Sequence, residues 1–274
     1  MAEVFDPVKG SEVNLEGWLD QVVQTWKVIP EVQLNPNKFK HLAIICDGNR
    51  RAAQLRGLNP WAGHRVGVEV IKGIMEAGRA WGIKHLTFWA WSTENWRRDP
   101  GQVDFVMNLA ARYLRDPEAV DELIKHQVKF THIGRKDRIP SEVRLAIDDL
   151  ELQTAGFDKL FVNLALDYGG IDEAARAIAK ISELIREGGL TELELAMNPG
   201  IILGFLDTGR QPAPDLVVRT GMPAEEIPRT SGFMPLQTVY SGWKFEPQLF
   251  PELTPQALLG DITDFLDYER RMGK

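Results

Sequence analysis

Apolar and polar residues alternate along most of the chain in blocks that predict strands and helices in turn. Short apolar runs, typical of buried strands, occur at residues 42–46, 83–91, 128–133, 160–166 and 216–218. Longer stretches with apolar residues three and four positions apart, typical of amphipathic helices, occur at 64–81, 102–113, 117–126, 141–152, 172–187 and about 255–271. Because buried strands that alternate with helices form parallel sheets, we expect an α/β fold with a largely parallel central sheet flanked by helices.

Residues 1–40 stand apart from this alternation as an N-terminal extension. Positions 14–29 predict one amphipathic helix, and the prolines that follow end the helical pattern. Residues 41–274 then form one larger domain. Small residues on the apolar stripe of 64–81 would let a groove open between that helix and the sheet, although such a stripe is ordinarily only core.

Composition narrows the classes of function. The chain has 274 residues, 44% of them hydrophobic, and a formal net charge of −7, so no general nucleic-acid surface is expected. One cysteine excludes an internal disulfide and fits a reducing cytosol. No apolar run approaches the roughly 20 residues of a membrane span, and the acidic start is unlike a signal peptide. We expect a cytoplasmic protein, and contact with the cytoplasmic face of a membrane stays open.

The most informative polar cluster follows the first predicted strand. Directly after the run 42–46 come Asp47, Gly48, Asn49, Arg50 and Arg51. Ligands of parallel sheets bind at the carboxyl ends of the strands, and a glycine lets the backbone approach a ligand closely. One carboxylate beside several phosphate-seeking donors suits Mg²⁺ with a diphosphate, because Mg²⁺ completes its shell with phosphate oxygens and water. From this segment alone, an ordinary Asp-Gly turn is the alternative.

A second cluster lies in the tryptophan-flanked segment after the run 83–91. Ser92 and Asn95 could orient a proton-transfer or phosphate group there, and Arg98 could hold a diphosphate with two hydrogen bonds. The alternative is a capped loop that leads into the next helix. His64, at a predicted helix start where free N–H groups attract anions, is either a donor to that ligand or a cap.

A third cluster follows the run 216–218. Arg219 and Arg229 each have hydroxyl neighbours, an arrangement that suits a second phosphate group. An isolated loop arginine is usually only solvated, so this interpretation depends on the other clusters.

Taken together, these clusters resemble the cis-prenyltransferase family, whose best-known members make undecaprenyl diphosphate. The family's opening pattern around Asp-Gly-Asn is matched at 41–53, and Gly-His-x-x-Gly at 63–67. Ser-x-Glu-Asn-Trp-x-Arg is matched at 92–98, and Tyr-Gly-Gly at 168–170. Pro-Asp-Leu-x-x-Arg-Thr is matched at 214–220, and Arg-Arg-x-Gly at 270–273. The resemblance covers about residues 41–274 in order, and it implies the family's fold, with an apolar tunnel between sheet and helices.

The resemblance implies a role for each matched residue. It makes Asp47 the Mg²⁺-holding carboxylate, and it assigns proton removal to Ser92 and Asn95, with His64 nearby. On the allylic diphosphate it places Gly48, Asn49 and Arg51, with His64 near this ligand as well. Arg50 stands where the family has a glycine, and we expect it to add a substrate contact. For isopentenyl diphosphate and further substrate contacts it implies Thr93, Glu94, Trp96, Arg98, Arg219, Arg229, Thr230 and Ser231. It also implies a homodimer in which Arg271 and Gly273 reach the partner's site.

One departure from the family pattern concerns the metal. Gly242 stands at the position of the family's second metal-binding glutamate. Glu246 would lie roughly 13 Å farther along a strand, so the loop residues Glu225 and Glu226 are better replacements, unless Asp47 holds the metal alone. We therefore expect slow or altered chemistry with a higher Mg²⁺ demand.

Three functions follow, one of them favoured. The favoured hypothesis is an enzyme that condenses isopentenyl diphosphate with an allylic diphosphate, such as farnesyl diphosphate, in the cis configuration with release of diphosphate. The alternatives are an irregular, head-to-middle coupling enzyme and a non-catalytic or weakly active partner subunit of a cis-prenyltransferase. Product length, the preferred allylic substrate and the role of residues 1–40 are open from sequence.

Overall fold

The computed structural model describes residues 7–209 and 211–268, and it contains the expected parallel sheet. Six strands lie in the order β3-β4-β2-β1-β5-β6, and every neighbouring pair is parallel. Their bounds are β1 (His41–Ile45), β2 (His85–Ser92), β3 (Val128–Ile133), β4 (Leu160–Tyr168), β5 (Leu216–Arg219) and β6 (Gly242–Phe245). The short, half-exposed β6 has no apolar run, and the sequence pattern therefore missed it.

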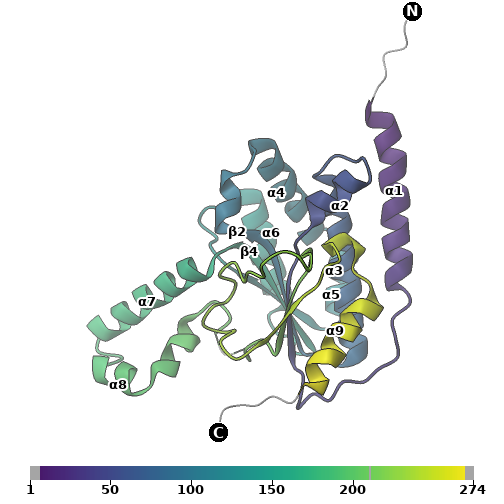
Figure 1. Ribbon diagram of the computed structural model, residues 1–274. Helices are drawn as coiled ribbons and strands as arrows, with labels where there is room; N and C mark the ends of the chain where they lie inside the picture. The colour runs from purple at the N-terminus through teal and green to yellow at the C-terminus, as the bar shows by residue number, and fades with distance from the viewer. Residues whose placement is uncertain (1–6, 210, 269–274) are drawn as a thin grey trace, which may run out of the picture.

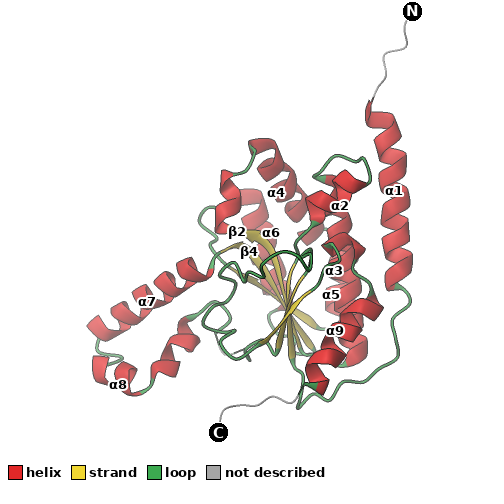
Figure 2. Cartoon of the chain, viewed as in Figure 1, coloured by secondary structure: helices red, strands yellow, loops and turns green. Residues whose placement is uncertain are grey.

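Helices cover both faces of this sheet, as the side view of the layers shows (Figures 1 and 2). The α-helices are α1 (Pro7–Trp26), α2 (Asn49–Leu55), α3 (Ala62–Trp81), α4 (Pro100–Leu114), α5 (Pro117–Lys125), α6 (Ser141–Thr154), α7 (Gly170–Arg186), α8 (Glu192–Met197) and α9 (Pro255–Asp267). Short 3-10 helices are η1 (Thr93–Arg97), η2 (Pro199–Phe205) and η3 (Phe250–Glu252). The two-turn α2, which begins inside the Asp-Gly-Asn motif, was not predicted.

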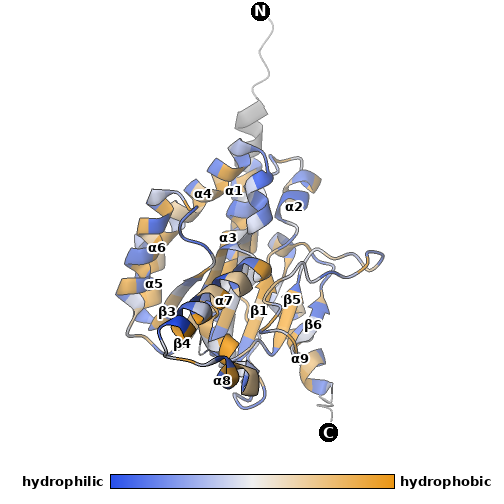
Figure 3. Ribbon diagram, turned by 90° about the vertical axis from the view of Figure 1, so that its left-hand side faces the viewer, coloured by the Kyte–Doolittle hydropathy of each residue, from blue (hydrophilic) through white to orange (hydrophobic). Residues whose placement is uncertain are grey.

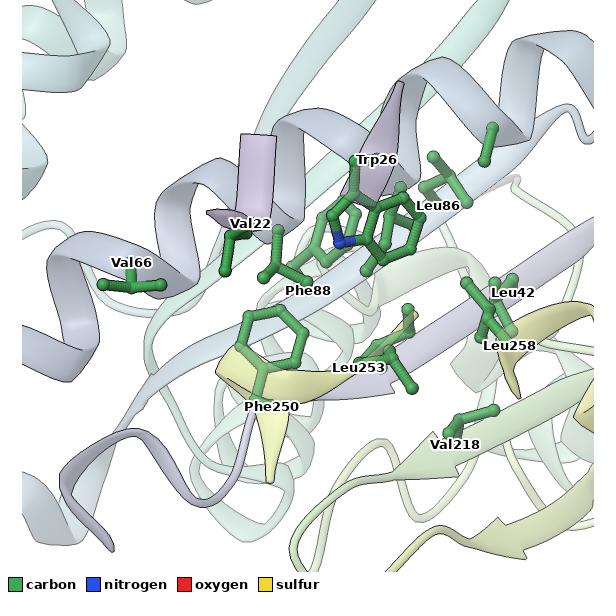
Figure 4. Packing of buried hydrophobic residues seen from close by; sticks show 14 of the residues in the cluster. Val22, Trp26, Leu42, Val66, Leu86, Phe88, Val218, Phe250, Leu253 and Leu258 are labelled. Carbon is green, nitrogen blue, oxygen red and sulfur yellow. The ribbon is translucent and has the colours of Figure 1, made fainter. Parts of the chain in front are cut away.

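The core sits on both faces of the sheet because side chains of a strand alternate between them. Leu42 and Ile44 of β1 enter a cluster with α1, α3 and α9, whereas Ala43 and Ile45 enter one with Phe233 on the opposite face. Figure 3 shows the central strands as predominantly hydrophobic, and Figure 4 shows the packing of the first cluster. Each such buried leucine or isoleucine stabilises the sheet by about 2–5 kcal/mol relative to alanine.

Two further features bear on function. The helices α7 and α8 form an arm that extends away from the sheet (Figure 1). Among the described residues, no helix is both long and apolar enough to span a bilayer.

Candidate functional site

The carboxyl ends of the parallel strands bring the predicted polar clusters together around one cavity. Asp47 follows β1, Ser92 ends β2 and Arg219 ends β5, and the parallel register places these ends on the same edge. The cavity has a volume of about 410 Å³. Its lining includes eleven of the predicted residues, namely Asp47, Gly48, Asn49, Arg50, Arg51, His64, Ser92, Asn95, Arg98, Arg219 and Ser231. We call this the polar cavity.

Asp47 lies at the centre of two ion pairs. Its Oδ1 is 3.2 Å from Nη2 of Arg51, and its Oδ2 is 3.0 Å from Nη2 of Arg219. The backbone of Asp47 is fixed as well, because its N–H donates to the Thr220 hydroxyl at 3.1 Å and its carbonyl accepts from Phe250 N–H at 3.0 Å. The carboxylate is 37% exposed, so it remains open to the cavity.

The chain turns sharply after Asp47 at Gly48. Gly48 has φ +104°, a conformation that favours glycine. A side chain at this position would also collide with the backbone of Leu249, whose Cα lies 3.0 Å from the position of a Cβ. Asn49 then donates from Nδ2 to the carbonyl of Cys46 at 2.8 Å, which leaves its buried Oδ1 without a protein partner.

His64 is held neutral at the inner end of the polar cavity. Burial lowers the pKa of His64 to about 4, and the positive charges of Arg98 and Arg50 act in the same direction. Its Nε2 is buried without a hydrogen-bond partner. A neutral imidazole with an unpaired nitrogen can donate to or accept from a ligand without adding a full charge.

The segment after β2 presents Ser92 and Asn95 because the strand is irregular there. The pairing of β2 with β4 shifts register on both sides of Trp91, and such irregularities re-aim side chains near sites. Arg98 lies 5.4 Å above the ring of Trp91. Burial and the neighbouring Arg50 lower the pKa of Arg98, so this pair of cations is arranged to receive an anion.

On the other side of Asp47, Arg219 is oriented by three contacts. Besides Asp47, its Nη1 donates to the carbonyl of Arg229 at 2.6 Å and to the hydroxyl of Ser231 at 2.7 Å. Its side chain is 13% exposed, and its Nε is buried without a partner. The loop after β5 therefore fixes the orientation of the Arg219 guanidinium. The sequence alone predicted only that Arg219 follows a strand.

The polar cavity adjoins a second, apolar one. This tunnel has a volume of about 470 Å³ and lies between the sheet and helices α3, α4 and α5. Both cavities are lined by Cys46, Asn49, His64 and Ala90, so they adjoin at these residues. Its apolar wall includes Val68, Ile71, Met75, Phe88, Val106, Leu109, Leu123, Phe130, Leu164 and Phe250.

Five predicted substrate contacts are not among the residues that line the polar cavity. Trp96 instead donates from Nε1 to the buried carboxylate of Asp167 at 2.7 Å, because the 3-10 turn η1 points its ring toward the core. Thr93 donates to the exposed Glu94 at 2.9 Å. Arg229 and Thr230 are exposed, and Arg229 contributes its backbone carbonyl rather than its guanidinium. The predicted tail contacts Arg271 and Gly273 lie outside the described residues.

Gly242 does not border Asp47 within the subunit. Its strand register pairs it with Leu216, which in turn pairs with Leu42. Asp47 lies five residues beyond Leu42, about 16 Å along the strand direction. Within one subunit, Gly242 and Asp47 therefore lie at opposite ends of the parallel strands. Which group, if any, replaces the family's second metal-binding glutamate stays a prediction.

The carboxylates considered as replacements for the family's second metal-binding glutamate do not lie together beside Asp47. Glu225 and Glu226 are exposed in the loop after β5, while Glu246 is nearly buried and accepts from the N–H of Gln248 at 2.8 Å. Within residues 7–209 and 211–268, no three histidine, cysteine or acidic side chains are grouped to hold a metal. Asp47 is the carboxylate that lines the polar cavity.

Six residues that line the polar cavity were not among the predicted site residues, namely Ile45, Cys46, Gln54, Trp89, Ala90 and Trp91. Gln54 and Trp89 show why. Gln54 lies one turn after Arg50 on α2, so the same helix face carries both, and recognition of α2 would have found it. Trp89 lies in the apolar run of β2 and reads as core in the sequence. No local signal separates it from its neighbours.

Comparisons with known proteins agree with this geometry. A family profile described as "Putative undecaprenyl diphosphate synthase" matches residues 45–273. The chain is 38% identical to the isoprenyl transferase of Aquifex pyrophilus, over 86% of this chain and 96% of that protein. It is 37% identical to the isoprenyl transferase of Agrobacterium fabrum, over 85% of this chain and 92% of that protein.

Two solved structures share the fold. Lavandulyl diphosphate synthase from Lavandula x intermedia, crystallised with dimethylallyl diphosphate, superposes with a TM-score of 0.78 at 31% identity, over 86% of this chain and 98% of that one. An undecaprenyl diphosphate synthase of Campylobacter jejuni, described as probable, superposes with a TM-score of 0.68 at 32% identity, over 88% and 100% of the two chains.

Proposed function

The chain belongs to the undecaprenyl diphosphate synthase family, and on that premise we propose that the polar cavity and the tunnel together are its active site. Its activity is prenyl transfer, in which isopentenyl diphosphate condenses with an allylic diphosphate in the cis configuration and diphosphate is released. The observation that carries the proposal is that the polar cavity and the tunnel adjoin and share lining residues. A diphosphate needs the cationic part and a prenyl chain needs the apolar part, and they meet at His64 and Asn49.

The geometry supports a division of the polar cavity between two diphosphates. Arg50 and Arg51 on α2 are placed to hold the allylic diphosphate, with the backbone at Gly48 close by. Arg219 and Ser231, on the opposite side of Asp47, are placed to hold isopentenyl diphosphate. Displacement of the Asp47 ion pairs by phosphate oxygens would free both guanidiniums for these ligands.

The chemistry then needs charge neutralisation and a dry channel. The allylic C–O bond breaks with its electron pair leaving on the diphosphate, and the terminal alkene carbon of isopentenyl diphosphate forms the new C–C bond to the allylic carbon. The tertiary cation that results loses a proton from the adjacent CH2 group, whose C–H electron pair forms the new double bond. Arg50 and Arg51, which hold the allylic diphosphate in this proposal, would stabilise the departing charge. Ser92 and Asn95 are placed to orient the group that takes the proton. The tunnel wall excludes water from the carbocation.

The donor set fits Mg²⁺ held together with the substrate. Mg²⁺ typically takes one or two carboxylates and fills its shell with phosphate oxygens and water, and Asp47 offers one exposed carboxylate beside the space for a diphosphate. When bound, the ion supplies charge neutralisation of the leaving group. We propose that Asp47 holds it, with no second carboxylate from this subunit.

We also propose that the chain forms a homodimer through the arm of α7 and α8. This arm and the adjoining η2 expose large apolar side chains, at Ile171, Ile178, Leu193, Met197 and Leu203. Exposed apolar groups gathered on one element typically mark an association surface. Sedimentation of the full chain tests the assembly.

The reaction is tested with the purified chain alone. Incubation with Mg²⁺, isopentenyl diphosphate and farnesyl diphosphate should yield a longer prenyl diphosphate and free diphosphate, and Asp47→Ala should abolish this turnover. A wild-type chain that is folded and inert, but activates a second cis-prenyltransferase, would instead be a partner subunit. The dimethylallyl diphosphate in the lavandulyl diphosphate synthase complex favours a second candidate, coupling of two dimethylallyl units, which incubation with that substrate alone would reveal.

A further inference from the structure

The helix α1 lies before the part of the chain that the family profile matches. The family profile begins at residue 45, and α1 ends at Trp26. Even so, α1 is part of the core rather than a loose appendage, because Trp18, Leu19, Val22 and Trp26 are all buried. Its partner is α3, along which it lies (Figure 1). The extension therefore supports one helix in particular.

That helix is a wall of the tunnel. Val68, Ile71 and Met75 of α3 line the tunnel. Gly73 is two residues from both Ile71 and Met75, which at 3.6 residues per turn places it about 160° around the helix from them. The side of α3 that faces α1 is therefore the side that faces away from the tunnel.

Trp26 is seated directly on the backbone of α3 at Gly73. A Cβ at position 73 would lie 2.3 Å from Cγ and 2.4 Å from Cδ2 of the indole, so no side chain separates the two helices there. Trp26 is 3% exposed and packs in the same cluster as Val66 of α3 and Phe88 of β2 (Figure 4). The indole thus supports the wall directly behind its tunnel-lining residues.

Helix α3 depends on packing against α1 because of its own sequence. Gly67, Gly73 and Gly78 all lie in the interior of α3, and interior glycines lower helix stability. One side of α3 borders the empty volume of the tunnel and so gains little packing there. The outer face must therefore supply the packing that keeps α3 in place.

Two polar contacts also hold α1 against its neighbouring segments. Glu16 of α1 pairs with Arg65 of α3 at 2.9 Å. Arg56, at the end of α2, lies 4.4 Å above the ring of Trp18 and pairs with Glu252 at 2.6 Å. These contacts connect α1 to α3, to α2 and to the segment that follows β6.

We propose that α1 is a brace that determines product length, with Trp26 as its main positioning residue. By supporting α3 from behind, it limits how far the tunnel can widen as the prenyl chain grows, so elongation stops when the chain no longer fits. This inference rests on the proposed prenyl transfer. It assigns to the N-terminal extension a role in specificity, while the first condensation, which occurs at the polar cavity, is left largely unaffected.

The test compares full-length wild type with Trp26→Ala, with Trp26→Phe and with the control Gln24→Ala, whose side chain is exposed on α1. Each is incubated with Mg²⁺, labelled isopentenyl diphosphate and farnesyl diphosphate, and both the initial rate and the distribution of product lengths are measured. Trp26→Ala should shift the distribution toward longer products by at least one five-carbon unit with a similar initial rate. Trp26→Phe should restore most of the wild-type distribution, and Gln24→Ala should match wild type.

Other results decide against the brace. An unchanged length distribution in folded Trp26→Ala overturns it, as does a loss of rate without a change in length. If Trp26→Ala does not fold, the milder variants Val22→Ala and Glu16→Ala carry the same expectation with a smaller shift. A wild-type chain that makes no prenyl product from either substrate set refutes the proposed function itself, whereas active wild type with unaltered variants refutes only the brace.

Discussion

The turn at Gly48 allows the positioning of Asp47 to be tested with a matched control. Gly48 and Gly57 flank α2, and both have positive φ, at +104° and +69°. A Cβ on Gly48 would lie 2.8 Å from Cδ2 and 3.0 Å from Cα of Leu249, whereas a Cβ on Gly57 would meet nothing within 4 Å. Alanine at either position therefore carries backbone strain, but only Gly48→Ala adds a collision with another segment.

The expected magnitudes follow from these two terms. The left-handed conformation costs an alanine about 1–2 kcal/mol, which is the whole effect expected for Gly57→Ala. Overpacking adds about 1–3 kcal/mol for Gly48→Ala. Because the clash includes the Cα of Leu249, a side-chain rotation cannot relieve it, and the hydrogen bond from Phe250 N–H to the Asp47 carbonyl must shift.

Urea unfolding and steady-state kinetics check this prediction. Gly48→Ala should lower the free energy of unfolding by about 2–5 kcal/mol. It should also reduce kcat, but by less than the roughly 100-fold that a displacement near 1 Å costs, because the contact with Leu249 Cα requires a shift of only a few tenths of an ångström. Gly57→Ala should lose stability alone and keep near wild-type turnover. Equal kcat values for the two variants would refute the reasoning that the Gly48 turn positions Asp47 for catalysis.

Four further outcomes are expected. Asp47→Asn should abolish turnover at any Mg²⁺ concentration, and removing Mg²⁺ with a chelator should do the same to wild type until the ion is restored; residual Mg²⁺-dependent turnover in the variant would contradict this. Because burial lowers the pKa of His64 from 6.5 to about 4, the unfolded chain binds the proton first as pH falls, so stability should decrease between about pH 6.5 and 4; His64→Asn should show a shallower decrease in urea midpoint. Arg219→Lys, which replaces the planar guanidinium fork with a single ammonium nitrogen, should raise KM for isopentenyl diphosphate more than KM for the allylic substrate. Gly242→Glu should lower stability without changing Mg²⁺ demand, because its Cβ would lie 2.6 Å from Cδ2 of Phe265; a lower Mg²⁺ requirement in that variant would contradict the placement.

Much of the site could be predicted because a parallel sheet converts sequence position into spatial position. Asp47, Ser92 and Arg219 each follow an apolar run, and parallel strands end on one edge, so their convergence needed only the correct identification of strands. The same reasoning failed where the chain leaves the strand direction in a tight turn. Trp96 follows β2 closely, but the tight turn of η1 directs its indole to Asp167 and away from the polar cavity.

The sequence by itself determined the strands, most helices and the polar clusters at the strand ends, because hydrophobic periodicity and local turn chemistry act over a few residues. Only the tertiary structure decided that the Asp47 carboxylate contacts both Arg51 and Arg219, although Arg219 is 172 positions away. It also decided that Gly242 lies at the far edge of the sheet. It alone placed the indole of Trp26 against Gly73, behind the tunnel. These outcomes depend on strand register and on helix packing between distant segments, which no local pattern encodes.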